Sequence, residues 1–274
     1  MIVLPENWKK YWNFKEEGFE RLFGVKGVAF SESNGRKTLR FRFGEKYYFG
    51  KFHTGVGWKK ILKNIIQFRR PPVLGAQNEW KAVEKLESLG IETMHIVGYG
   101  KQGWNPAKLQ SFIITDELKD TITLEKYCKD WASIPPSYSL KRSLITEVAK
   151  IARIIHENGI NHRDFYICHF LLDISKGLES IDPKNIRLFL VDLHRAQIRS
   201  KTPFRWRAKD ISGILFSSMD LGLTKRDLLL FASVYHNTTP GKSLSENRFF
   251  WWVVKIRAVR LYKKIFKKNP PKIR

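Results

Sequence analysis

The segment NHRDFYICHFLLD, residues 161–173, sets ionisable and polar groups directly before a mostly apolar run. A buried strand does not normally begin with charged residues, and a surface loop does not normally continue into many aromatic and aliphatic side chains. We therefore expect a loop that holds the carboxylate of Asp164 in place because the apolar residues after it are anchored in the core. Few folds offer such an arrangement.

The neighbouring segments narrow the choice of fold further. LKRSLITEVAKIARIIHENG predicts a helix with one apolar face, including Leu144, Val148 and Ile155, and Gly159 ends it. After the opening motif, RLFLVDLH (187–194) predicts a short strand that ends in Asp192. A helix, a glycine, His-Arg-Asp and two strands are the layout of a protein-kinase-like catalytic loop followed by a metal-binding loop.

Phosphoryl transfer requires that the acceptor hydroxyl is oriented, that the phosphates are bound and that a metal ion is positioned beside them. Asp164 would orient the acceptor hydroxyl, and Asp192 would bind Mg²⁺, which prefers oxygen ligands. The His-Arg-Asp tripeptide alone is a weak signal, and an alternative stays open in which Asp164 only caps a helix end.

The first part of the chain is rich in predicted strands. Residues 25–52 alternate around turns and indicate an antiparallel meander. Lys51 lies near the end of the run YYFGKF, where a kinase-like fold needs a lysine for the α- and β-phosphates. Glu79 lies early in a predicted helix at 76–89 and could pair with Lys51, although each residue, taken in isolation, could be an ordinary surface charge. Gly35, in the turn SESNGRK, could cover the phosphates or simply belong to a hairpin.

These patterns predict an α+β protein-kinase-like bilobal fold. Residues 1–118 would form an antiparallel β-rich N-lobe with one internal helix, and residues 119–274 a mainly helical C-lobe.

The formal net charge is +24, from 50 Lys and Arg against 26 Asp and Glu. Such a protein is expected to meet an anion: nucleic acid, lipid headgroups or a polyanionic substrate. The two cysteines, Cys128 and Cys168, have no metal-site or disulfide spacing. No signal peptide or spanning apolar segment is evident, so we expect a cytosolic protein that touches a membrane from that side.

Four blocks of the sequence resemble the lipopolysaccharide core heptose kinases, heptose(I) kinases in particular: PPVLGAQNEW, NHRDFYICHFLL, VDLHRAQIR and RWRAKDISGILFSS. The resemblance runs from about residue 25 to 235. It implies an ATP- and Mg²⁺-dependent kinase of an inner-core heptose, peripheral at the cytoplasmic face of the inner membrane of Gram-negative bacteria. Its partners would be the lipopolysaccharide inner-core glycolipid and an anionic membrane surface, and no nucleic acid is expected.

Carried over to this sequence, the resemblance gives Asp164 as the catalytic aspartate, Asp192 as a metal ligand, and Lys51 with Glu79 at the nucleotide. Asp210 would brace the catalytic loop or merely cap a helix. Two residues differ from those at the corresponding positions of protein kinases or of the heptose kinase family. His169 stands where protein kinases have a metal-binding Asn, so it could bind metal, orient a phosphate or only pack. Phe165 replaces a small residue of the family and is expected to alter the acceptor pocket.

Three basic regions could meet the anionic surface: residues 51–60, residues 195–207 and the tail from Lys255. Residues 249–268 mix aromatics and cations like an interfacial helix, or alternatively pack a Trp and Ile side on the core. Rival functions remain a kinase of the same fold acting on Kdo, the second heptose or a protein side chain, and a non-catalytic nucleic-acid-binding protein.

Overall fold

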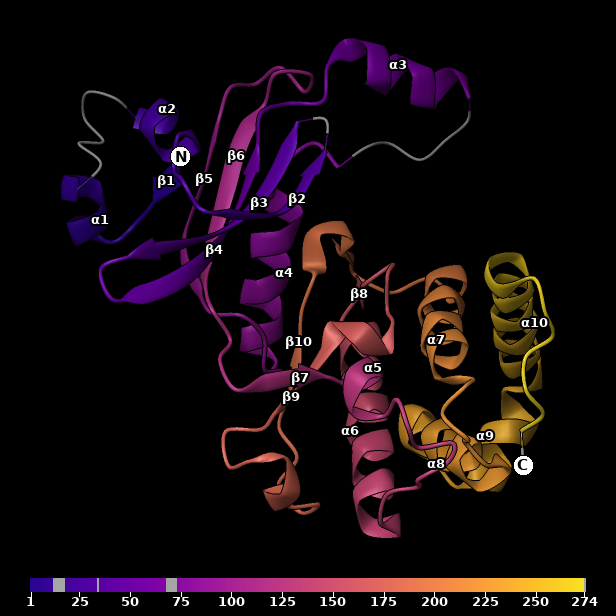
Figure 1. The fold of residues 1–274 in the computed structure, drawn as a ribbon. Helices are drawn as coiled ribbons and strands as arrows, with labels where there is room; N and C mark the ends of the chain where they lie inside the picture. The colour runs from indigo at the N-terminus through magenta and orange to yellow at the C-terminus, as the bar shows by residue number, and fades with distance from the viewer. Residues whose placement is uncertain (12–17, 34, 68–72, 274) are drawn as a thin grey trace. The chain divides into compact units, whose positions relative to one another are not determined.

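A computed structural model describes residues 1–11, 18–33, 35–67 and 73–273 (Figure 1). The chain divides into two compact units. One contains residues 1–85 and 94–118, and the other contains residues 86–93 and those from 119 onward. Among the described residues, no helix combines the length and hydrophobicity that crossing a bilayer requires.

The first unit is built on a six-stranded antiparallel sheet with the order β1-β5-β6-β4-β3-β2. The meander predicted at residues 25–52 is confirmed as its strands β2, β3 and β4. The elements of this part of the chain are β1 (Ile2–Val3), α1 (Glu6–Tyr11), α2 (Gly18–Phe23), β2 (Val28–Ser33), β3 (Arg36–Phe43), β4 (Lys46–His53), α3 (Trp58–Ile66), α4 (Gln77–Ser88), β5 (Ile96–Gln102) and β6 (Gln110–Asp116).

One face of this sheet is covered by aromatic side chains from α1 and α2. Trp8 meets Tyr48 edge to face at 4.8 Å between ring centroids, and Phe19 meets Phe112 in the same way at 5.4 Å. Helix α4 packs separately, through Trp80 and the buried Ile113 of β6. The Ser111 hydroxyl accepts a hydrogen bond from the Ala76 amide at 2.9 Å, so the start of α4 is fixed to β6.

The second unit is mainly helical, with two small antiparallel sheets of order β10-β9-β7 and β11-β8. Its elements from residue 119 onward are β7 (Thr121–Thr123), α5 (Leu124–Tyr127), α6 (Tyr138–Glu157), β8 (Ile160–Asn161), η1 (Ile167–His169), β9 (Phe170–Asp173), η2 (Leu178–Ser180), β10 (Leu188–Leu190), η3 (Leu193–Arg195), β11 (Gln197–Ile198), α7 (Phe204–Ser218), α8 (Lys225–His236), α9 (Pro240–Glu246) and α10 (Arg248–Phe266).

The predicted long helix is confirmed as α6, whose buried face includes Leu144, Val148 and Ile155. The Ser137 hydroxyl caps its first turn by accepting from the Leu140 amide. After the helix, Gly159 has φ +78°, and a Cβ there would clash with the carbonyl oxygen of Arg199. Only glycine fits this approach of two backbones, which lets the chain turn directly into β8 and the candidate catalytic loop.

Two predicted elements differ in the structure. The strand expected at 187–194 is only three residues long, because Asp192 has a left-handed backbone (φ 63°, ψ 52°) that cannot continue strand pairing. The C-terminal helix packs on the core, as one of the two alternatives expected, and Trp251 lies against Tyr235. Its fully buried stripe, however, is Phe250, Val254, Ala258 and Tyr262, with a spacing of four.

Candidate active site

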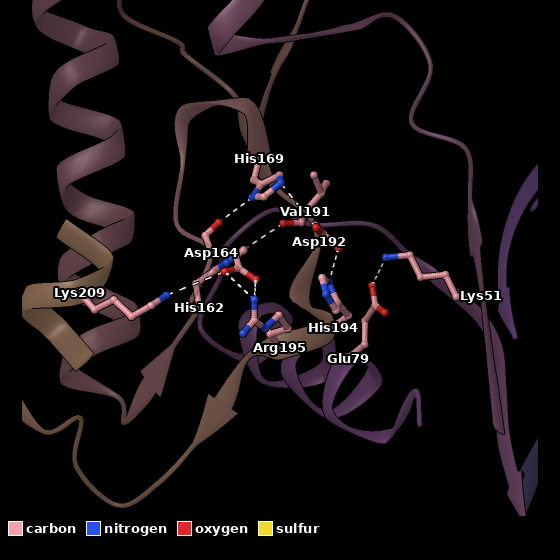
Figure 2. Close-up of polar contacts among 10 residues, drawn as sticks. All are labelled: Lys51, Glu79, His162, Asp164, His169, Val191, Asp192, His194, Arg195 and Lys209. Carbon is pink, nitrogen blue, oxygen red and sulfur yellow. Dashed lines mark hydrogen bonds and ion pairs between the residues drawn. The ribbon is translucent and has the colours of Figure 1, made fainter. Parts of the chain in front are cut away.

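The polar residues singled out by the sequence form one group in each unit, and the two groups are described separately (Figure 2). In the first unit, Nζ of Lys51 lies 2.5 Å from Oε1 of Glu79. Strand β4 supplies the lysine and the first turn of α4 supplies the glutamate, whose side chain is 1% exposed. A buried carboxylate is stable only with a cation beside it, so this pair fixes the direction of the Lys51 side chain.

Gly35 lies in the turn between β2 and β3 with φ +79°. A Cβ at this position would clash with the carbonyl oxygen of Gly55, and the Thr54 amide donates to the Gly35 carbonyl at 2.9 Å. The close approach of two backbone segments therefore requires this glycine. Its contact with a phosphate stays a prediction.

The second unit holds the His-Arg-Asp loop through its backbone. The carboxylate of Asp210 accepts from the amides of His162 at 2.7 Å and Arg163 at 2.9 Å. Arg163 has φ +75°, a strained conformation for a non-glycine residue, and the two hydrogen bonds hold it there. Asp210 lies inside α7, whose N-cap is Pro203, so of the two expected alternatives it braces the loop and does not cap the helix.

Two cations flank the carboxylate of Asp164. Nη1 of Arg195 donates to Oδ1 at 3.2 Å and to Oδ2 at 3.0 Å, while Nζ of Lys209 lies 3.9 Å from Oδ1 (Figure 2). The Asp164 side chain remains 19% exposed, so solvent or an acceptor can still reach it. The cations stabilise the ionised carboxylate and restrict its rotation.

A second carboxylate lies close to the same loop. Oδ1 of Asp192 accepts from Nδ1 of His194 at 2.6 Å, and its Oδ2 lies 3.5 Å from Nε2 of His169. His169 also donates from Nδ1 to the backbone carbonyl of Asp164 at 2.7 Å. The structure therefore brings Asp164, His169 and Asp192 together, although the two aspartates are on different loops (Figure 2).

The hydrogen bond to Asp164 determines the tautomer of His169. A carbonyl oxygen can only accept, so Nδ1 carries a proton, and in the neutral form of the ring Nε2 has a lone pair. That lone pair lies on the side of Asp192, whose carboxylate oxygen Oδ2 is also an electron-pair donor. A cation between Nε2 and Oδ2 would satisfy both groups.

His162 is entirely buried beneath these residues. Burial lowers its pKa below the usual value for histidine, so the ring is neutral near pH 7. Its Nε2 donates to the Val191 carbonyl at 3.0 Å, and its ring stacks on His169 at 5.7 Å. His162 thus links the loop of Asp164 to the residue directly before Asp192.

The side chain of Phe165, which was expected to alter the acceptor pocket, is buried and not exposed to an acceptor. Its side chain is 1% exposed and packs edge to face on Phe170, with His162 and His156 beside it. Its carbonyl oxygen approaches α7 so closely that a Cβ on Gly213 would lie 2.6 Å away. This apolar packing explains why a carboxylate precedes a hydrophobic run: Phe165 fixes the backbone that carries Asp164.

Several site residues were missed by reasoning from the sequence. Arg195 was assigned to a membrane-facing basic region but contacts Asp164, and Lys209 and His194 were not singled out. The available signals were local: Arg195 and His194 follow Asp192 closely, and Lys209 precedes Asp210. Among the described residues, no cluster of three or more His, Cys, Asp or Glu side chains could hold a metal ion by itself.

Comparison with known proteins identifies one family. The model of the lipopolysaccharide kinase (Kdo/WaaP) family matches residues 20–235. The lipopolysaccharide core heptose(I) kinase WaaP of Escherichia coli strain K12 is 43% identical over 98% of this chain and 100% of its own length. The protein of the same name from Pseudomonas aeruginosa is 44% identical over 85% of both chains.

A solved structure described as WaaP in complex with acyl carrier protein is also similar. It covers 96% of this chain and 99% of its own, with 38% identity and a TM-score of 0.82. The similarity covers nearly the whole length of the chain and therefore includes both units.

Proposed function

Because the chain belongs to the lipopolysaccharide kinase (Kdo/WaaP) family, we propose that it transfers the γ-phosphoryl group of ATP to a hydroxyl of the first heptose, HepI, in the lipopolysaccharide inner core. The observation that carries this conclusion is the 43–46% identity to relatives named heptose(I) kinase, over 85–98% of the chain. The enzyme is a phosphotransferase with an alcohol as the acceptor.

Asp164 is proposed to receive the hydroxyl group of the heptose. Its carboxylate would accept a hydrogen bond from this hydroxyl and take its proton as the oxygen bonds to phosphorus. Arg195 and Lys209 support this role by holding the carboxylate in one orientation. Both cations could also balance the negative charge of the phosphoryl group during transfer.

The residues around Asp192 fit a Mg²⁺ ion. One carboxylate, together with substrate phosphates and water, is an ordinary ligand set for this ion, and Nε2 of His169 adds a lone pair on the same side. When bound, Mg²⁺ would neutralise charge on the phosphates. The protein would contribute Asp192 as the oxygen ligand, positioned by His194, and His169 as the nitrogen ligand.

Lys51 is proposed to bind the α- and β-phosphates, with Glu79 directing it. Gly35 lies in a turn whose backbone amides would contact a phosphate.

The acceptor is part of a glycolipid, so we also propose peripheral association with the anionic cytoplasmic face of the inner membrane. The charge of +24 and the aromatic and basic side chains of α10 support this location. Because a solved relative was studied in complex with acyl carrier protein, that protein is a candidate partner here as well.

The assignment is tested with purified protein, ATP and defined inner-core acceptors that contain Kdo alone, Kdo with HepI, or both heptoses. We expect phosphate on HepI only, located by ³¹P–¹H correlation NMR. The Kdo-only acceptor tests the alternative of a Kdo kinase, since the family description names Kdo as well as WaaP. Phosphate on Kdo, on the second heptose or on protein, with HepI unmodified, would refute the proposal.

A further inference from the structure

The structure assigns a second anion site to this protein: a pocket in the C-terminal unit that fits a phosphate or a phosphate monoester. The pocket has a volume of about 230 Å³ and lies among the ends of α6 and α8 and the start of α7. The residues that define it chemically are Arg153, His156, Glu157, Lys201, Arg207 and His236. It contains neither Asp164 nor Asp192, so it is distinct from the site proposed for phosphoryl transfer.

The charge of the pocket selects an anion. Arg153, Lys201 and Arg207 contribute three cations, and Glu157 is the only carboxylate in the lining, which leaves a surplus of two positive charges. Two of the cations are guanidinium groups, whose planar arrangement of N–H donors matches the oxygens of a phosphate. The volume is below the roughly 300–1,000 Å³ of pockets for drug-sized ligands, so the ligand is small.

Two residues of the lining carry buried polar atoms. Nε of Arg207 and Nε2 of His236 are buried and have no hydrogen-bond partner among the described residues. A buried polar atom without a partner is unfavourable, so a shift of either side chain that brings this atom to an anion in the pocket would relieve the cost. Burial, followed by the charge of Arg207, lowers the pKa of His236 to about 4, so its neutral ring can donate one N–H to an anion.

The pocket is connected to the catalytic loop. Nδ1 of His156 shares a 2.8 Å hydrogen bond with the Tyr235 hydroxyl, and Nε2 of the same ring lies 3.4 Å from Oδ2 of Asp210. Asp210 in turn accepts from the amides of His162 and Arg163. A short chain of hydrogen bonds therefore connects a ligand in the pocket with the loop that carries Asp164.

The test follows the ring resonance of His236 by ¹H–¹³C NMR while inorganic phosphate replaces chloride at constant ionic strength. In the wild-type protein we expect a saturable shift of this resonance. The double variant Arg153→Gln/Lys201→Gln should bind phosphate about tenfold or more weakly, since each charge-assisted hydrogen bond contributes roughly 1.5–3 kcal/mol. Circular dichroism verifies that this variant is folded.

The matched control is Lys225→Gln/Arg226→Gln, which removes the same charge from exposed positions in the same unit. It should bind phosphate like the wild type. If the His236 resonance does not move at saturating phosphate, or if both double variants lose the response equally, the pocket is not a phosphate site. Binding of phosphate at the proposed nucleotide site does not interfere, because the His236 ring reports on the pocket alone.

The ligand could be a soluble phosphate or a phosphate on a lipid, and we infer a soluble one because the pocket is small. Sedimentation with phosphatidylcholine vesicles that contain phosphatidic acid separates the two sources. The two double variants should bind these vesicles equally. A specific loss in Arg153→Gln/Lys201→Gln would overturn the soluble source.

Discussion

At the scale of single residues, the candidate site depends on a few side chains that each have two partners. His169 is the clearest case, because its two ring nitrogens face the loops of both aspartates. Asp210 is another, with two backbone amides and His156 around one carboxylate. Substitution of such a residue affects both of its partners. The most informative variants therefore change one chemical property of the side chain and keep its size.

The variant Asp164→Asn tests the role of the carboxylate. The amide keeps the size of the side chain but cannot take a proton from the heptose hydroxyl, so we expect phosphoryl transfer to fall by about 10²–10⁴-fold. The protein should remain folded and bind ATP with an affinity near that of the wild type, measured by calorimetry. Transfer at the wild-type rate would remove Asp164 from the mechanism.

The variant His169→Ala tests metal ligation. If Nε2 binds Mg²⁺, the concentration of Mg²⁺ needed for half-maximal activity should rise about tenfold or more. His169→Asn, which restores an oxygen ligand at this position, should reverse most of this rise. A fall in kcat with an unchanged Mg²⁺ requirement in both variants would instead indicate that the ring only positions Asp164.

The buried ring of His236 predicts a pH dependence of stability. Its pKa is lowered from 6.5 to about 4 in the folded protein, so below about pH 6.5 the unfolded chain binds a proton that the folded protein does not. Stability contributed by this group is therefore lost as the pH falls from about 6.5 to about 4. Urea unfolding of His236→Gln should show a smaller loss over this range than the wild type, and an identical loss would contradict the prediction.

At the scale of secondary-structure elements, the catalytic loop is held where α6, α7 and two short strands meet. The chain leaves α6 through Gly159, forms β8 and the loop, and then packs the Phe165 backbone on Gly213 of α7. A glycine inside a helix costs about 1 kcal/mol relative to alanine, so its presence in α7 indicates a need for space. These contacts make the position of the loop a property of several elements.

The variant Gly213→Ala therefore separates helix propensity from loop position. Alanine improves helix propensity, but its Cβ would lie 2.6 Å from the Phe165 carbonyl and must displace the loop. We expect lower kcat and a lower melting temperature. Gly241→Ala in α9 is the matched control, because nothing lies within 4 Å of its added Cβ, and it should keep activity and stability. Equal behaviour of both variants would show that the loop tolerates the displacement.

At the scale of the whole molecule, the dominant property is the charge of +24. Helix α10 adds exposed aromatic side chains to this charge, with Phe249 65% and Trp252 57% exposed. Its opposite side is buried against the protein, so these rings and the neighbouring cations are available to a membrane surface.

We expect the protein to bind vesicles of anionic lipid and to release them as salt increases. Each Lys or Arg near such a surface contributes about 1 kcal/mol to the binding free energy. The Debye screening length shortens from roughly 10 Å at 0.1 M salt to roughly 3 Å at 1 M, so salt weakens this attraction. Sedimentation with anionic and with purely zwitterionic vesicles measures the effect. The double variant Phe249→Ser/Trp252→Ser should bind anionic vesicles more weakly, and salt-independent binding would argue against an electrostatic membrane contact.

The sequence alone determined the type and order of most elements and the family. Alternating residues predicted the strands of the first part, the apolar stripe predicted α6, and the segment at 161–173 placed a carboxylate before an anchoring core. These features are local, because the periodicity of a strand or helix and the start of a loop depend on residues that are close together in the sequence.

Only the tertiary structure decided what surrounds the two aspartates. Arg195 is 31 residues from Asp164, and Asp210 is 48 residues from His162, so no local pattern pairs them. Their contacts arise when α7 packs on the loop and β11 pairs with β8. The side chains that set charge, tautomer and orientation at the site are chosen by packing between elements distant in sequence, which periodicity does not encode.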